Sequence, residues 1–226
     1  MQATGDKSRT ALGLSAQPQG DRAARSTVMV VDDDPSVREA LEALVQLAGW
    51  RVKSFASAAE FLASPPRPGP SCLVLDVSLP DLNGLELQAR IAGERTAMPI
   101  IFITGFGDVP MSVQAMKAGA AEFLTKPFDD DALLAAIDAA LERSDAALGA
   151  EATLQALRER RASLSPRECE VMDLVVAGLL NKQVGGELGI SEITVKAHRG
   201  RVMEKMQARS FADLVRMSQA LGLGAG

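Results

Sequence analysis

The chain has 226 residues, 47% of them hydrophobic, and a net charge of −5, which fits two ordinary domains and excludes a largely disordered chain. Cys72 and Cys169 lie too far apart for a disulfide framework or a metal-ligand spacing, so each is predicted to be a small buried hydrophobe in a reducing compartment. No run reaches the roughly 18 apolar residues of a membrane helix. We therefore expect a cytoplasmic protein without a membrane partner.

Charge is unevenly distributed along the chain. Residues 1–150 hold 13 basic and 20 acidic residues, a net charge of −7, whereas residues 151–226 hold 11 and 9, a net charge of +2. An acidic part and a mildly basic part indicate two functions. Residues 1–26 are polar and rich in Gly, Gln, Ser and Pro, and their apolar patch is too short for a signal peptide. They are predicted to form a disordered tail.

Residues 27–144 alternate between short apolar runs and amphipathic segments. The alternation predicts an α/β domain with a five-stranded, parallel, doubly wound sheet. The expected strands are 27–32, 51–56, 71–76, 99–104 and 121–125, and the expected helices are 35–48, 57–63, 84–93, 109–119 and 130–144.

The next segment, residues 145–163, separates this domain from the rest of the chain. Leu148, Leu154 and Leu157 recur near helical spacing, and Gly149 is a candidate break. The segment is either a helical linker that continues the preceding helix or a partly helical, solvated linker.

Residues 164–226 contain only helical patterns and predict an all-α four-helix domain. The helices are expected to begin after the caps Ser165 and Ser191, near Asn181, and after the cap Ser210. The tandem glycines 185 and 186 fall inside the second helix, where each costs about 1 kcal/mol relative to Ala.

Polar side chains follow the strands of the first domain. Asp32 and Asp33 end the first strand, Asp76 the third, Thr104 the fourth and Lys126 the fifth. They are expected to converge, because ligands in such sheets bind beyond the carboxyl ends of the strands. Three adjacent carboxylates repel one another, and Mg²⁺ prefers carboxylate ligands. A carboxylate nucleophile beside Mg²⁺ and a lysine suits phosphoryl transfer.

The motifs "VVDDD", "LVLDVSLPDLNG", "IIFITGFGDVPMSVQAMKAGA" and "FLTKPF" occur in this order. Together they resemble the receiver domain of two-component response regulators, and the third most resembles the FixJ type. The resemblance implies that Asp76 is the phosphoacceptor. It also implies that Asp33 binds Mg²⁺ directly, Asp32 binds it largely through water, and the backbone carbonyl of Ser78 completes the site. Asp34 is predicted to cap the following helix rather than to bind metal.

The same resemblance implies a switch. Lys126 would contact the phosphoryl group beside a cis Lys126–Pro127 bond, and Thr104 would move toward the phosphate and let Phe123 turn inward. The implied phosphodonor is a sensor histidine kinase. Phosphorylation would then favour a homodimer through the face formed by residues 109–141.

The stretch "LSPRECEVMDLVVAGLLNKQVGGELGISEITVKAHRGRVMEKM" resembles the LuxR/FixJ-type DNA-binding domain, a four-helix unit with a helix-turn-helix. On a helical wheel Val195, Val202 and Met206 face the core. The opposite face contains Ile193, Lys196, Ala197 and Gly200, and its small residues suit entry into a major groove.

We expect this domain to bind double-stranded promoter DNA as a dimer, because one small, mildly basic copy would bind weakly. Activation of transcription through RNA polymerase is what the family implies. The expected DNA-binding residues are Asn181, Lys182, Thr194, Lys196, Ala197, His198, Arg199, Gly200, Arg201 and Lys205.

The sequence leaves two alternative functions to compare with this one. A metal-dependent phosphatase with an aspartyl nucleophile typically has a second acid two residues later, where this chain has Ser78. The sequence therefore argues against an enzyme. A constitutive DNA-binding dimer with a purely structural receiver is disfavoured by the complete acidic site but stays open.

Overall fold

A computed structural model describes residues 25–105 and 109–223. The chain divides into two compact units, Met1–Leu148 and Gly149–Gly226. The expected tail lies outside the described residues except for Arg25 and Ser26. Ser26 is fully buried, and its carbonyl accepts a hydrogen bond from the Arg51 N–H. Ser26 therefore packs with the first unit, although the sequence assigned it to the tail.

The first unit is built on a parallel sheet in the order β2-β1-β3-β4-β5. This order confirms the doubly wound α/β fold. It reverses direction between β1 and β3, so their carboxyl ends open onto the same crevice. The strands are β1 (Thr27–Val31), β2 (Arg51–Phe55), β3 (Ser71–Asp76), β4 (Ile100–Thr104) and β5 (Glu122–Thr125).

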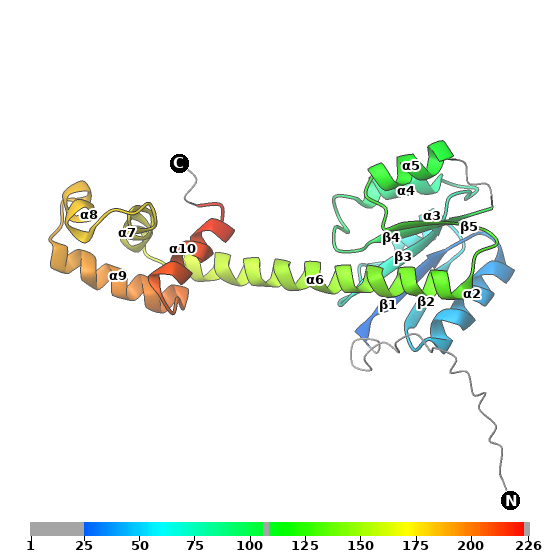
Figure 1. Cartoon of the computed structure of the whole chain (residues 1–226), viewed down its shortest axis with the longest axis horizontal. Coiled ribbons are helices and arrows are strands. Elements are labelled where there is room, and N and C mark those ends of the chain that lie inside the picture. Colours follow the sequence, from blue (N-terminus) through cyan, green and yellow to red (C-terminus); the bar gives the residue numbers. More distant parts are fainter. Residues whose placement is uncertain (1–24, 106–108, 224–226) are drawn as a thin grey trace, which may run out of the picture. The chain divides into compact units, whose positions relative to one another are not determined.

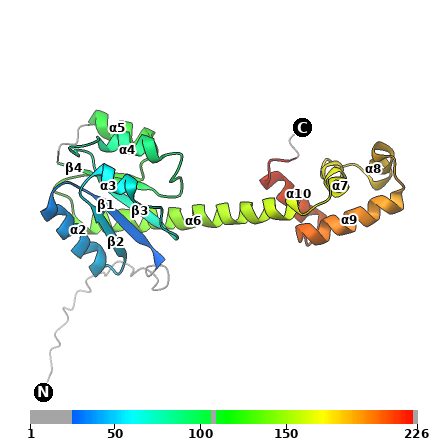
Figure 2. The same ribbon diagram turned by 180° about the vertical axis from the view of Figure 1, so that it is seen from behind.

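Helices cover both faces of the sheet (Figures 1 and 2). One face carries α2 (Pro35–Leu47) and the first part of α6 (Asp130–Ala162). The other carries α3 (Ala58–Ala63), α4 (Gly84–Ile91) and α5 (Val109–Lys117). Alternate residues of the central strands enter the two cores, so these strands are buried on both sides.

Helix α6 includes nearly all of the segment 145–163 and does not end at Gly149. Its early turns bury Leu133, Ile137 and Leu141 in the core of the first unit. The Ser144 hydroxyl accepts a hydrogen bond from the Ser71 N–H and donates one to the Ala97 carbonyl. None of the helices in the described part of the chain has both the length and the apolar character that a membrane span requires.

The second unit contains α7 (Pro166–Val176), α8 (Asn181–Leu188), α9 (Glu192–Met206) and α10 (Phe211–Ala220) around one apolar core. Its first, third and fourth helices begin at the expected serines. The hydroxyls of Ser165, Ser191 and Ser210 each accept a hydrogen bond from the backbone N–H three residues later. Val195, Val202 and Met206 are fully buried, which confirms the predicted core face of α9.

Candidate functional site

Three carboxylates meet at the carboxyl ends of β1 and β3. One oxygen from each of Asp32, Asp33 and Asp76 lies within 4.8 Å of the others. Asp32 and Asp76 are buried, whereas Asp33 is exposed. The cluster therefore opens to solvent on the Asp33 side and is enclosed by protein on the other.

Lys126 supplies the positive charge within the cluster. Its ammonium donates hydrogen bonds of 2.7 Å to Oδ2 of Asp32 and to Oδ2 of Asp76. Burial raises the pKa of Asp32, and the lysine opposes this effect. Burial acts to lower the pKa of Lys126, but the two carboxylates outweigh it, so the pKa is raised. The lysine therefore stays protonated.

Backbone groups orient both buried carboxylates. Oδ1 of Asp32 accepts a hydrogen bond from the Asp34 N–H, and Oδ1 of Asp76 accepts one from the Ser78 N–H, each of 2.9 Å. The Asp34 side chain accepts from the Ser36 N–H at 2.8 Å and caps α2, which confirms the cap prediction.

Close backbone packing also fixes the position of Asp76. A Cβ atom added to Gly84, at the start of α4, would lie 2.7 Å from the Asp76 carbonyl oxygen and 3.2 Å from the Phe102 ring. No side chain fits there without movement of β3. Sequence reasoning missed this role, although the glycine lies in the "LPDLNG" motif.

The remaining receiver residues lie around the cluster. Thr104 is fully buried, and its carbonyl accepts a hydrogen bond of 2.8 Å from the Lys126 N–H. The half-buried Phe123 ring lies 6.2 Å from the Phe102 ring. The Lys126–Pro127 bond is cis, as expected. The movements of Thr104 and Phe123, and the Ser78 carbonyl as a metal ligand, stay predictions.

Carboxylate oxygens are the ligands that Mg²⁺ prefers. Among the described residues, three carboxylates converge here and Lys126 forms ion pairs with two of them, so the cluster keeps negative charge that suits a divalent cation. The donor set therefore fits the expected metal.

In the second unit, α9 presents an exposed face opposite its buried residues. Ile193 is 81% exposed, and Lys196, Ala197, Gly200 and Arg201 are exposed as well. The face combines small residues with cations, so a major groove can accept it closely.

Comparisons with known proteins match both units. The profile of the response regulator receiver domain matches residues 28–138, and that of the bacterial regulatory proteins of the luxR family matches residues 162–218. Nodulation protein W of Bradyrhizobium diazoefficiens is 51% identical over 205 residues, which are 91% of this chain and 90% of that protein. The chain belongs to the response regulators.

Full-length relatives extend the match. The transcriptional regulatory protein FixJ of Bradyrhizobium diazoefficiens is 43% identical over 87% of this chain and 96% of its own length. The solved structure of the response regulator StyR has a TM-score of 0.78 at 46% identity and covers 87% of this chain and 99% of its own. This response regulator thus combines a receiver with a LuxR-type DNA-binding domain. Its relatives are transcriptional regulators and not enzymes.

Two expected DNA-binding residues of the regulator contact each other. The Arg199 guanidinium donates a hydrogen bond of 2.9 Å to Oδ1 of Asn181 and lies 4.9 Å from the centre of the Phe211 ring. It joins α9 to the first residue of α8 and to α10. The Asn181 amide oxygen is therefore occupied, which leaves its NH₂ group as the donor available to a phosphate.

Lys205, near the end of α9, contacts residues before and within α7. Its ammonium donates hydrogen bonds of 2.6 Å to the buried Glu168 carboxylate and 3.2 Å to the Ser163 carbonyl. Glu168 also accepts from the Ser165 N–H in a capping box. Lys205 therefore neutralises a buried acid, and its contact with DNA stays a prediction.

The other expected DNA-binding residues differ in exposure. Lys182 is exposed, and Thr194 and His198 are half-buried. The Thr194 and Ser191 hydroxyls lie 2.8 Å apart. The His198 Nδ1 atom is buried without a hydrogen-bond partner among the described residues.

Proposed function

We propose that Asp76 accepts a phosphoryl group from the phosphohistidine of a sensor histidine kinase. A carboxylate oxygen of Asp76 forms the new P–O bond as the P–N bond breaks, and the departing imidazole takes a proton. The observation that carries the proposal is the position of this nearly buried carboxylate, 2.7 Å from Lys126 and within the acidic cluster. The ammonium stabilises negative charge on the entering phosphoryl oxygens.

Asp32, Asp33, Asp76 and the Ser78 carbonyl would hold Mg²⁺. When bound, the ion reduces the electrostatic repulsion between the negatively charged phosphodonor and the carboxylates. The protein's own contribution is orientation, because backbone N–H groups fix one oxygen of Asp32 and one of Asp76.

Phosphorylation then favours a homodimer. The phosphoryl group draws Lys126 and Thr104, and Phe123 fills the space that Thr104 leaves. The exposed apolar side chains of α5 support this interface: Val109, Val113 and Met116 recur at helical spacing and are 75%, 44% and 46% exposed. If the phosphoryl group stabilises the active conformation of the receiver over the inactive one by a few kcal/mol, most molecules become active.

Dimerisation presents two DNA-binding units to a promoter palindrome and roughly doubles the phosphate contacts. Each unit enters a major groove with the face formed by Lys196, Ala197 and Gly200. Arg201 and Lys182 contact phosphates. The bound dimer then activates transcription through RNA polymerase, in the cytoplasm.

The test treats the wild type and Asp76→Asn with acetyl phosphate and Mg²⁺, then measures intact mass and sedimentation. The wild type should gain about 80 Da, one phosphoryl group, and sediment as a dimer. The variant should do neither. Val113→Glu should gain the mass but stay monomeric.

Three outcomes contradict parts of this proposal. Mass gain in Asp76→Asn would move the phosphoacceptor elsewhere. Phosphorylation without dimers would make another step the control point. Stable DNA-bound dimers without phosphate, unchanged in Asp76→Asn, would favour the constitutive regulator.

A further inference from the structure

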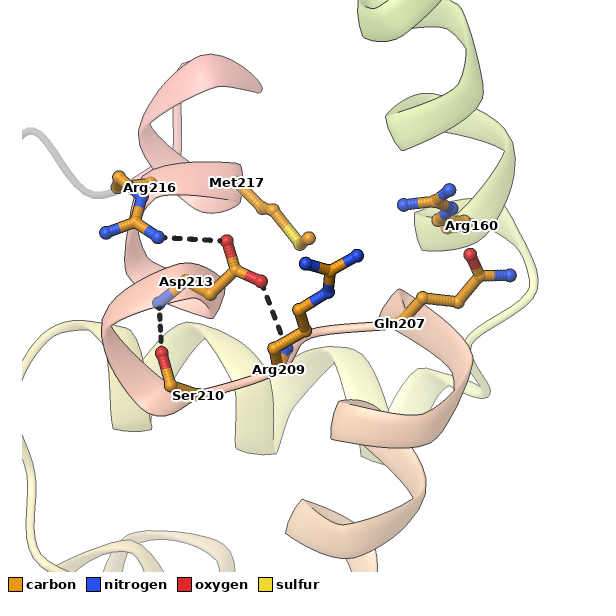
Figure 3. Close-up of a pocket in the computed structure, with 7 residues that line it drawn as sticks. All are labelled: Arg160, Gln207, Arg209, Ser210, Asp213, Arg216 and Met217. Atoms are coloured by element: carbon orange, nitrogen blue, oxygen red, sulfur yellow. Dashed lines mark hydrogen bonds and ion pairs between the residues drawn. The ribbon is translucent and has the colours of Figure 1, made fainter.

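A hollow of about 400 Å³ lies on the surface of the second unit (Figure 3). It is lined by the last turns of α6, the turn between α9 and α10, and the first turns of α10. Its charged and amide-bearing lining residues are Arg160, Gln207, Arg209, Asp213 and Arg216. The hollow thus contains three guanidinium groups and one carboxylate.

The single carboxylate is already engaged. Asp213 accepts a hydrogen bond of 3.0 Å from the Arg209 backbone N–H and forms an ion pair of 3.2 Å with Arg216. One carboxylate cannot offset three guanidinium groups, so the hollow keeps an excess of positive charge.

Arg160 and Arg209 point toward each other across the hollow (Figure 3). Among the residues that the structure describes, neither guanidinium forms an ion pair with an acid. Two facing cations repel each other, and an anion between them removes the repulsion. Guanidinium groups also present paired donors that match the oxygens of a phosphate.

Gln207 adds a neutral donor at an unusual backbone position. It is the C-cap of α9 with φ 57°, and within the described residues it is the only non-glycine residue with positive φ. Glycine is the usual residue at such a cap, because other residues are strained there. The chain therefore has a strained residue, and not glycine, at the position whose side-chain amide lines the hollow.

The hollow also lies in line with the DNA-facing side of α9. Gln207 follows Gly200 by seven residues and Lys196 by eleven, close to two and three helical turns, so the three share one side of the helix. Gly200 and Gln207 are separated by about 10 Å along the axis. The major groove is about 12 Å wide. With Gly200 facing the groove, Gln207 reaches the phosphates at its edge.

We propose that this hollow binds a backbone phosphate of DNA. Arg160 and Arg209 donate to the phosphate oxygens from opposite sides, and the Gln207 amide adds a further donor. Because Arg160 belongs to α6, the end of the linker helix becomes part of the DNA interface. This inference rests on the proposed docking of α9 in the major groove.

The experiment uses the full-length chain, treated with acetyl phosphate and Mg²⁺, and a fluorescent random-sequence duplex. Anisotropy gives the dissociation constant over a range of salt concentrations. The slope of log K against log salt should become shallower in Arg160→Gln and in Arg209→Gln, by up to about 0.9 for each protomer that contacts the duplex, because each neutralised phosphate releases about that number of counterions. Arg158→Gln removes the same charge from an exposed position on the same helix and should leave the slope unchanged.

Gln207→Gly is the third variant. Glycine suits the positive φ, so folding is preserved, but the neutral donor is lost. Binding should weaken without a change in slope. Equal slopes for Arg160→Gln and Arg158→Gln would overturn the inference. So would unchanged DNA binding with loss of promoter activation, which would assign the hollow to an acidic protein partner.

Lys196→Gln separates this inference from the function on which it rests. If the salt dependence of binding becomes shallower in Lys196→Gln but not in Arg160→Gln or Arg209→Gln, only the proposed phosphate site in the hollow is wrong. If the wild type binds no duplex, or Lys196→Gln keeps the wild-type slope, the proposed docking of α9 is wrong as well.

Discussion

The ammonium of Lys126 lies 2.7 Å from Oδ2 of Asp76. The same ammonium lies 2.7 Å from Asp32, so it occupies an oxygen of each buried carboxylate in the cluster. A cation that enters the cluster therefore meets carboxylates whose charge is already partly offset. Lys126 both holds the acids together and competes with the metal for them.

We accordingly expect Lys126→Met to raise the Mg²⁺ affinity by about tenfold, since one charge a few ångströms away is removed. The same change should slow phosphoryl transfer, because no ammonium then meets the phosphoryl oxygens. Calorimetric titration with Mg²⁺ and intact mass against time measure the two effects.

Lys117→Met is the control, because it removes a charge from the exposed end of α5. It should leave both quantities unchanged. A Mg²⁺ affinity in Lys126→Met equal to or below that of the wild type would show that the lysine does not compete with the metal.

Gly84→Ala should disturb the phosphoacceptor without touching its side chain. The new Cβ would lie 2.7 Å from the Asp76 carbonyl oxygen, so β3 or α4 must shift. We expect a loss of roughly 1–3 kcal/mol in the free energy of unfolding and slower phosphorylation. Gly93→Ala is the control, because nothing lies within 4 Å of its added Cβ. It should change neither the free energy of unfolding, measured by urea titration, nor the rate of phosphorylation, measured by intact mass against time. Similar behaviour of the two variants would refute the packing argument.

The sequence was sufficient to predict the sheet and the cluster on it. Apolar runs that end in Asp32, Asp76, Thr104 and Lys126 predict strands, and one topological rule brings their carboxyl ends together. That argument needs no side-chain packing. It accordingly placed the acids and the lysine correctly and identified Asp34 as a cap.

Features that depend on contacts between elements could not be predicted in this way. A helical wheel places Lys205 on the flank of α9 but contains no information about α7, whose Glu168 binds it. The close approach of Gly84 to Asp76 and the positive φ of Gln207 likewise arise from packing in three dimensions. The sequence offered only the glycine in its motif as a signal.

Gly185 and Gly186 should respond oppositely to alanine. A Cβ at Gly186 meets nothing within 4 Å, whereas one at Gly185 would lie 2.7 Å from the Ile190 carbonyl oxygen. Gly186→Ala should therefore stabilise the second unit by up to about 1 kcal/mol through helix propensity. Gly185→Ala should destabilise it, since the turn between α8 and α9 must open. Thermal unfolding measures the Tm of both variants. A change of Tm in the same direction in both would contradict the prediction.

The pair of Glu168 and Lys205 makes the second unit sensitive to acid. A hydrogen bond from Lys205 and one from the Ser165 N–H lower the pKa of Glu168 to about 2, from an ordinary value of 4.5. Because the folded state binds this proton more weakly than the unfolded state, the pair stabilises the unit above about pH 4.5. That stability is lost as the pH falls toward 2. Hydrogen exchange in α7 should show the loss.

Variants of Glu168 and Lys205 distinguish the acid sensitivity caused by this pair from that caused by other acidic residues. Glu168→Gln should be less stable than the wild type at neutral pH and should lack this part of the acid response. Lys205→Met should be more harmful than Glu168→Gln at neutral pH, because it leaves a buried carboxylate without its cation. The double variant should therefore recover part of the stability lost in Lys205→Met. Additive losses in Tm would instead mean that the ion pair contributes nothing beyond its separate members.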